Sequence, residues 1–281
     1  CLSQPLRELA SRIRGAEAPV AFILNARDAT DGLEQVLAAC READVAVILD
    51  ESATDLSRAN FLARRHPVDV VVTGESLTHG LVPYGAFSMA PETYRFWNNL
   101  DDCLIHTSTF GGNALALSAV VEHLSAALAR DPGYQAVQER VATIRADQRA
   151  TIRAFRRYVN PCLALLLQSL GLDRRVTSAR GTRFTLQGVG GEISVLDALG
   201  SYGSCLRGHN PPDILREVLD VHDSEKDYWK DLAARLGSLT ALPRVFSTVS
   251  GATAVDKAIT LALAARKDRP EMVVFDKGYA G

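Results

Sequence analysis

Lysine is scarce in this sequence: only five of its 31 basic residues are lysines, and all five follow residue 225. Chemistry that starts from a lysine amine is therefore excluded from residues 1–225. The net charge of −2 gives no reason to expect nucleic acid or an anionic membrane as a partner. The longest apolar runs, such as Cys162–Leu167, are too short to span a bilayer, and no charged-then-apolar secretory leader opens the chain.

Paired cysteines are also missing. The five cysteines are scattered, odd in number and without a CxxC motif, so we expect no structural disulfide, no metal site and a reducing cytoplasm. Cys40 and Cys162 lie among apolar residues and are interpreted as small core residues, and no catalytic motif surrounds any cysteine. The sequence begins with Cys1 instead of Met, and we interpret it as a piece of a longer protein.

Short apolar runs alternate with helical patterns along the 281 residues. The predicted strands are Val20–Leu24, Val45–Asp50, Val68–Thr73, Arg244–Val249 and Met272–Phe275, with a hairpin of Thr182–Val189 and Gly191–Asp197. The predicted helices are Leu33–Ala43, Asn113–Arg130, Gln135–Tyr158, Asn160–Leu170, Pro211–Val221, Tyr228–Leu239 and Ala252–Arg266. This alternation indicates an α/β fold of three layers, with a mostly parallel sheet and helices on both faces.

Two sites stand out in this pattern. Ser250, Gly251 and Ala252 follow an apolar run and open a helix, where free N–H groups and the helix dipole favour a phosphate. The alternative is an ordinary N-cap serine beside a packing glycine. Asp50 ends a buried strand, where an unpaired carboxylate is costly and a cationic partner would offset that cost. Its alternative is a carboxylate that caps the next segment.

Three segments in the first half carry a resemblance to a known family. Asp50-Glu51, residues 66–86 and His106–Asn113 resemble, in order and spacing, the second half of the cofactor domain of class III (ornithine/ω-type) pyridoxal-phosphate aminotransferases. That family has Gly-Lys-Ser-Leu where this chain has Gly-Glu-Ser-Leu, and the family's lysine forms the Schiff base with the cofactor. Glu75 occupies the position of that lysine. The resemblance implies the large domain of PLP-dependent transferase fold type I.

The second half resembles the amino-terminal half of the same family. The matching segments are Tyr158–Pro161, Gly171–Asp173, Asp197–Gly203, Gly208–Pro211, Val245–Ala258 and Phe275–Gly281. We therefore expect a degenerate second half of a cofactor domain in residues 1–130, a helical connector in 131–157 and a first half in 158–281. A tandem arrangement of two units and a permuted reading of one gene both fit this order. In either case the two halves could form one composite sheet.

The resemblance implies a role for each matching residue. Asp50 would hold the ring nitrogen of pyridoxal phosphate, and Tyr279 would stack on its ring. The turn at Ser250, Gly251 and Ala252 would hold the phosphate. Thr109 would reach the phosphate of a neighbouring subunit's cofactor, which implies a homodimer; its alternative is a loop threonine bonded to its own backbone.

The chain departs from the family at several further positions. Ser52-Ala53 replaces Val-Gln, and Thr78-His79 replaces Gly-Gly. We interpret this clustering as the decay of a site that no longer functions. An acid–base pair of Glu75 and His79 could not replace an amine in imine chemistry.

The sequence therefore predicts an aminotransferase-like protein that is inactive as this fragment. The family moves an amino group from an amine or amino acid to a keto or aldehyde acceptor. The alternative is a pseudoenzyme that acts as a non-catalytic dimerisation or scaffold module.

Overall fold

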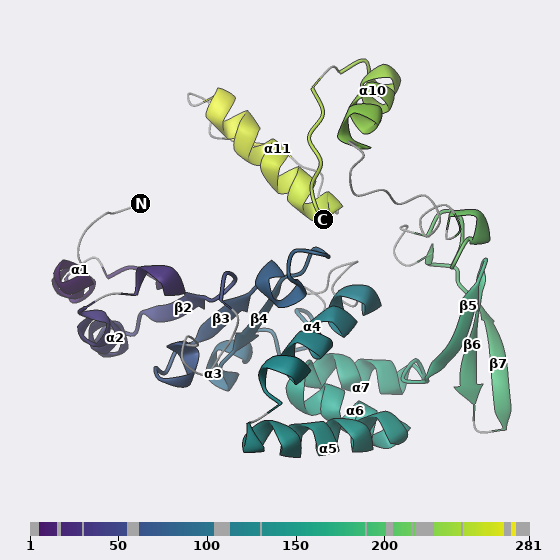
Figure 1. The fold of residues 1–281 in the computed structure, drawn as a ribbon, viewed down its shortest axis with the longest axis horizontal. Coiled ribbons are helices and arrows are strands. Elements are labelled where there is room, and N and C mark those ends of the chain that lie inside the picture. Colours follow the sequence, from purple (N-terminus) through teal and green to yellow (C-terminus); the bar gives the residue numbers. More distant parts are fainter. Residues whose placement is uncertain are drawn as a thin grey trace. The chain divides into compact units, whose positions relative to one another are not determined.

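A computed structural model gives the fold of the protein (Figure 1). It describes residues 6–15, 18–29, 31–54, 62–103, 113–129, 131–188, 190–200, 205–214, 216, 228–242, 244–266 and 271–273. The chain divides into two compact units, one of residues 1–107 and 111–175 and the other of residues 108–110 and 176–281. This division does not test the domain boundaries expected from the sequence at residues 130 and 158, and they remain predictions.

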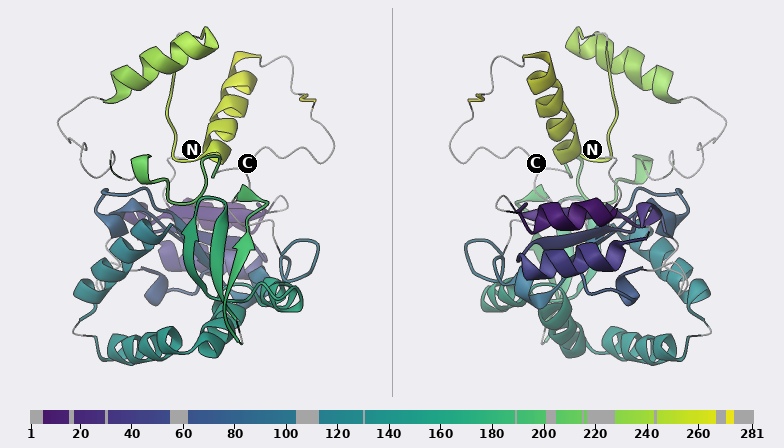
Figure 2. Two further views of the ribbon diagram at one scale, coloured as in Figure 1. Left: turned by 90° about the vertical axis from the view of Figure 1, so that its right-hand side faces the viewer. Right: turned by 90° about the vertical axis from the view of Figure 1, so that its left-hand side faces the viewer.

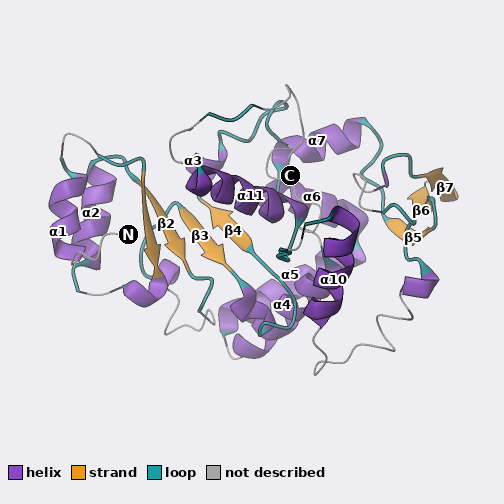
Figure 3. Cartoon of the chain, turned by 90° about the horizontal axis from the view of Figure 1, so that it is seen from above, coloured by secondary structure: helices purple, strands orange, loops and turns teal. Residues whose placement is uncertain are grey.

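The first unit contains a four-stranded sheet whose strands follow one another in chain order (Figure 3). The strands are β1 (Ala21–Asn25), β2 (Ala46–Asp50), β3 (Val70–Thr73) and β4 (Ala86–Met89). The first three are parallel and β4 is antiparallel to β3. The predicted α/β fold with a mostly parallel sheet is confirmed, and the three strands predicted here are found with small shifts at their ends.

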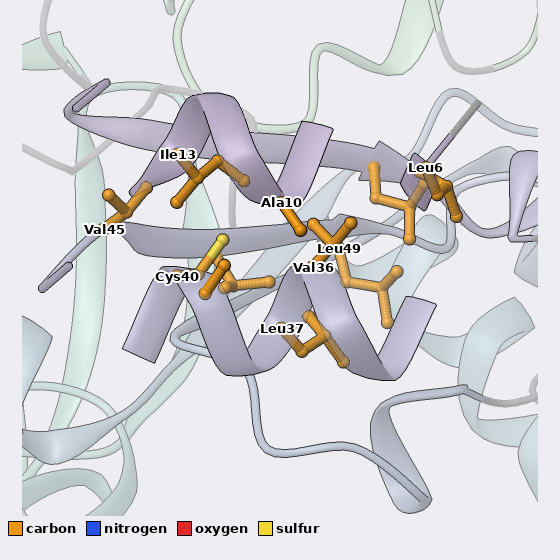
Figure 4. Packing of buried hydrophobic residues seen from close by; sticks show 11 residues of the cluster. Leu6, Ala10, Ile13, Val36, Leu37, Cys40, Val45 and Leu49 are labelled. Atoms are coloured by element: carbon orange, nitrogen blue, oxygen red, sulfur yellow. The ribbon is translucent and has the colours of Figure 1, made fainter. Parts of the chain in front are cut away.

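Helices α1 (Leu6–Ile13) and α2 (Leu33–Glu42) pack against each other and against this sheet (Figure 2, right). The apolar spacing of α2 places Val36, Leu37 and Cys40 in the core, where they meet Ala10 and Ile13 of α1 (Figure 4). From the sheet, β1 contributes Leu24, and the core side chains of β2 are Val47 and Leu49. Ile23, which points to the opposite face of the sheet, is 68% exposed.

Short helical turns and four longer helices complete the first unit. The turns are η1 (Ala26–Asp28), η2 (Leu62–Arg64), η3 (Glu75–Thr78) and α3 (Pro91–Tyr94). The longer helices are α4 (Ala114–Ala127), α5 (Pro132–Ala146), α6 (Gln148–Tyr158) and α7 (Pro161–Ser169). The prediction of one helix over Gln135–Tyr158 is wrong, because Asp147 adopts an extended conformation and caps a new helix. No helix in the described ranges is long and apolar enough to cross a membrane.

The second unit contains a three-stranded antiparallel sheet of its own (Figure 2, left). Its strands are β5 (Val176–Arg180), β6 (Arg183–Gly188) and β7 (Gly191–Leu196). The predicted hairpin corresponds to β6 and β7, whereas β5 was not predicted. Helices α10 (Tyr228–Thr240) and α11 (Gly251–Ala265) lie where helices were expected.

Two strands predicted for the second unit are not found where the structure describes the chain. Residues 244–248 have no regular secondary structure, so the predicted strand Arg244–Val249 is wrong. A strand exists only when a neighbour pairs with it, and here Phe246 remains 83% exposed. Residues 272 and 273 are also irregular, and the rest of the predicted strand Met272–Phe275 lies outside the described residues. Most of the predicted helix Pro211–Val221 lies outside them as well.

Candidate functional site

Asp50 is the last residue of β2, at the carboxyl end of the parallel strands. Its register partner on β1 is Asn25, whose amide Nδ2 donates to Asp50 Oδ2 at 3.1 Å. The backbone N–H of Ser52 donates to Asp50 Oδ1 at 2.9 Å. Hydrogen bonds from the Ser52 side chain, from its backbone and from Asn25 lower the pKa of the Asp50 carboxyl, while partial burial acts in the opposite direction. Asp50 is therefore an ionised, oriented carboxylate at neutral pH.

Glu51, the next residue, is fully buried. Its Oε1 accepts the backbone N–H of Leu62 at 2.8 Å, and its Oε2 accepts the hydroxyl of Thr54 at 2.7 Å. Both partners belong to the segments on either side of residues 55–61. Because a buried carboxylate needs hydrogen-bond donors, Glu51 fixes the chain that follows β2 and so supports Asp50. No separate role was predicted for Glu51 from the sequence, although an acidic residue directly after a buried strand is a usable signal.

The fold brings the turn that carries Glu75 next to this loop. Gly74 is buried, and a Cβ added to it would lie 2.7 Å from Cβ of Ser52. Ser76 Oγ donates to the carbonyl oxygen of Thr54 at 2.7 Å. Glu75 itself is exposed at the start of η3. Asp50 and Glu75 thus lie on adjoining segments, and position 75 presents a carboxylate.

Thr78 and His79, for which the resemblance predicts a Gly-Gly pair, both make specific contacts. Thr78 is buried, and its hydroxyl lies 2.7 Å from the carbonyl oxygen of Val82 and 3.1 Å from that of Glu75. His79 adopts a left-handed conformation with φ of 52°, which glycine accommodates most easily. Its Nε2 lies 3.0 Å from Nδ1 of His123 on α4. The imidazole considered as a partner for Glu75 therefore lies against a second histidine.

Ser250 caps the first turn of α11, as the capping alternative predicts. Its Oγ accepts the backbone N–H of Thr253 at 3.2 Å and lies 2.6 Å from the Thr253 hydroxyl. A Cβ added to Gly251 would meet no atom within 4 Å, so packing does not require a glycine there. The N–H groups of the first turn, including those of Gly251 and Ala252, have no acceptor within the helix. The turn can therefore receive an anion, and its binding of phosphate remains a prediction.

The structure does not bring the other predicted cofactor residues together with Asp50. Thr109 and Tyr279 lie outside the described residues. Asp50 belongs to the first unit and Ser250 to the second, and each sheet takes its strands from one unit. A composite site that joins the two halves remains a prediction. Among the described residues, no group of three or more metal-ligating side chains is present.

The comparison with protein families identifies one match. Residues 27–153 match the model of the family described as aminotransferase class-III. The matched segment contains β2, β3, the turn at Glu75 and helix α4. It also extends into α5 and α6, the segment expected from the sequence to be a connector.

Solved structures of aminotransferases resemble the chain at low identity. An ornithine aminotransferase from Toxoplasma gondii is 23% identical, with 65% of this chain and 40% of that chain covered and a TM-score of 0.35. An ω-transaminase from Thermomicrobium roseum is 19% identical, with 66% and 41% covered and a TM-score of 0.37. An adenosylmethionine-8-amino-7-oxononanoate aminotransferase from Methanocaldococcus jannaschii is 22% identical, with 66% and 42% covered and a TM-score of 0.37. The chain thus spans less than half the length of these proteins.

Proposed function

We propose that the protein is an aminotransferase-like chain that binds pyridoxal phosphate without a covalent link, because residues 27–153 match the model of the class-III aminotransferase family. The observation that carries this proposal is the placement of Asp50. It is an ionised carboxylate at the end of β2, and the turn that should supply a lysine lies against its loop and supplies Glu75 instead.

The residues present fit two parts of the cofactor. The Asp50 carboxylate accepts hydrogen bonds from Asn25 and from the backbone and side chain of Ser52. A carboxylate has about four acceptor positions, so one remains for a protonated ring nitrogen. The first turn of α11, capped by Ser250, suits the phosphate. Position 75 does not fit the third part, because a carboxylate cannot form an imine with the aldehyde. When bound, pyridoxal phosphate supplies an electron sink for the carbon next to an amino group.

The chain's own residues would orient and protonate this group. Asn25 and Ser52 hold the Asp50 carboxylate in one orientation, and its lowered pKa keeps it charged, so that it would keep a proton on the ring nitrogen. Glu75 would add negative charge near an anionic ligand and weaken binding. We therefore propose that the chain is an aminotransferase-like protein that lacks transaminase activity.

Amino transfer from an amine or amino acid to a keto or aldehyde acceptor would then belong to relatives that keep the lysine. A non-catalytic role as a dimerisation or scaffold module is the second candidate. It is favoured by the contacts of Thr78 and His79, since these keep the turn folded without serving catalysis. We further propose a homodimer and a cytoplasmic location, in keeping with the role expected for Thr109 and with the scattered cysteines.

The test restores the missing amine. Glu75→Lys should yield a borohydride-reducible cofactor adduct at residue 75 after incubation with pyridoxal phosphate, located by peptide mass spectrometry. The parent chain and the control Glu75→Gln, which removes the charge without adding an amine, should yield none at this residue.

A second substitution tests the role of Asp50. Adding Asp50→Asn to Glu75→Lys should reduce the adduct yield by about tenfold, since the charged partner of the ring nitrogen is lost. Robust transamination by the parent chain would contradict the proposal. Failure of Glu75→Lys to form the adduct, in a chain that keeps its circular dichroism, would favour the scaffold role.

A further inference from the structure

A second cluster of reactive side chains lies in the second unit, where the loop after β7 folds back onto the β5–β6 turn. Asp197 follows β7, and its N–H donates to the carbonyl oxygen of Thr182 at 2.8 Å. His209 exchanges two backbone hydrogen bonds with Gly181, at 2.8 Å and 3.1 Å. Gly208 has φ of +79°, and a Cβ there would lie 2.7 Å from the Gly181 backbone. The backbone therefore fixes both Asp197 and His209 against the same turn.

The side chains of Asp197 and His209 form a short hydrogen bond. His209 Nε2 lies 2.7 Å from Asp197 Oδ2, and the two side chains are 16% and 8% exposed. Oδ1 of the same carboxylate accepts the N–H groups of Leu199 and Gly200, each at 2.9 Å. The hydrogen bond from His209 lowers the pKa of the Asp197 carboxyl, so it is ionised and can only accept. The proton of the neutral imidazole therefore lies on Nε2, which leaves Nδ1 with a free lone pair.

That lone pair faces a thiol. Sγ of Cys205 lies 3.9 Å from Nδ1 of His209, at a sulfur hydrogen-bond distance. The ring of Phe184 packs edge-on against the imidazole, with 5.4 Å between the ring centroids. Cys205 is half-buried, unlike Cys40 and Cys103, which are buried. A nucleophile, a base and a carboxylate that orients the base are thus assembled in one place.

We propose that Cys205 is a reactive thiol that undergoes exchange with small disulfides. The thiol proton moves to Nδ1 of His209, and the thiolate attacks one sulfur of the disulfide. A sulfur–sulfur bond forms to Cys205 while the original one breaks, and the departing thiolate takes the proton from His209. The products are a mixed disulfide and one free thiol, so atoms and electrons balance. This site is independent of the proposed cofactor role.

Disulfide exchange suits the cluster better than acyl transfer. Exchange needs a thiolate and a proton for the leaving thiolate, and Cys205 and His209 supply both. Acyl transfer needs in addition donors aimed at a developing oxyanion. The partial burial of Cys205 favours a small disulfide over a protein partner.

The test measures thiol reactivity in the native 281-residue chain. The protein is treated with less than one equivalent of dithiobis(nitrobenzoate), a small aromatic disulfide, and the labelled cysteines are identified by peptide mass spectrometry. Cys205 should react about tenfold faster than Cys162 in the same molecules, and about tenfold faster than Cys205 in the urea-unfolded chain. Equal or slower reaction of Cys205 in the native chain would overturn the proposal.

Substitutions test the roles of the base, His209, and of the orienting carboxylate, Asp197, one at a time. His209→Gln keeps an amide donor for Asp197 but removes the base, so the rate at Cys205 should fall to the unfolded-chain level. Asp197→Asn should lower the exchange rate at Cys205, because the new amide can donate to Nε2 of His209 and so place the ring proton on Nδ1. Asp197→Glu keeps a carboxylate and should retain part of the parent rate. The matched control is His66→Gln, which removes a histidine paired with Glu34 in the first unit and should leave the rate unchanged. A full rate in His209→Gln would rule out the assigned base.

Discussion

At the scale of single residues, the turn at Glu75 is closely fitted to its surroundings. Thr78 fills buried space and donates to Val82, and His79 meets His123 on α4. The family's Gly-Gly pair could make neither contact, because glycine has no side chain. The substitutions interpreted from the sequence as decay therefore contribute to the local structure. The carboxylate at position 75 therefore stands in a turn that is well folded.

Gly74 provides a direct test of that fit. In Gly74→Ala, the new methyl group would lie 2.7 Å from Cβ of Ser52, so the strand ends must move apart. We expect the free energy of unfolding to fall by about 1–3 kcal/mol, measured by urea denaturation. Gly85→Ala is the matched control, since its Cβ would meet nothing within 4 Å, and it should be neutral or slightly stabilising. Equal stability of the two variants would show that the β2 and β3 loops are not in close contact.

At the scale of elements, one carboxylate decides where a long helical pattern breaks. Asp147 ends α5 with φ of −124° and caps α6, and its side chain accepts the N–H groups of Arg149 at 2.9 Å and Ala150 at 3.2 Å. We expect Asp147→Ala to lower the free energy of unfolding by about 1 kcal/mol, because an N-cap is lost. Asp147→Asn keeps the accepting oxygen and should retain most of the stability. A loss in the asparagine variant as large as in the alanine variant would argue against capping.

The helix break and the wrong strand show what the sequence could not decide. β1, β2 and β3 were predictable, because each is a continuous apolar run that pairs with a neighbour close in sequence. The apolar residues of 244–249 form a similar run, but no periodicity reveals whether a pairing strand exists. Asp50 could be found because it ends a buried strand. The cluster at Cys205 could not, because Asp197 and His209 reach the thiol only through the fold.

At the scale of the whole molecule, the buried hydrophobic residues in the part of the chain that the structure describes belong to the first unit. The cluster of buried apolar residues runs from Leu6 to Leu49. Helices α10 and α11 of the second unit bury no residue. Local stability rises with buried apolar contacts, so the two units should open with different free energies.

Hydrogen exchange followed by mass spectrometry can measure this difference in the full chain. Amides of α2, β1 and β2 should exchange slowest, because their residues form the core. Amides of α10 and α11 should exchange at least about tenfold faster under the same native conditions. Helix α4, which buries Ala116 and Val120, serves as an internal reference and should exchange more slowly than α10 and α11. Equal protection of α10 and β2 would contradict this ordering.

The chain-order arrangement of β1, β2, β3 and β4 has a consequence for how the protein is made. Hydrogen bonds in and around this sheet join residues 13, 22 and 25 positions apart, so each strand meets a neighbour synthesised shortly before it. Short separations keep the entropy of loop closure small and make folding fast. The sheet can therefore assemble while the ribosome is still adding later residues, since domains fold as units from the amino terminus during synthesis. The loop that holds Asp50 against the turn at Glu75 can then be in place before strands β5, β6 and β7 of the second unit are made.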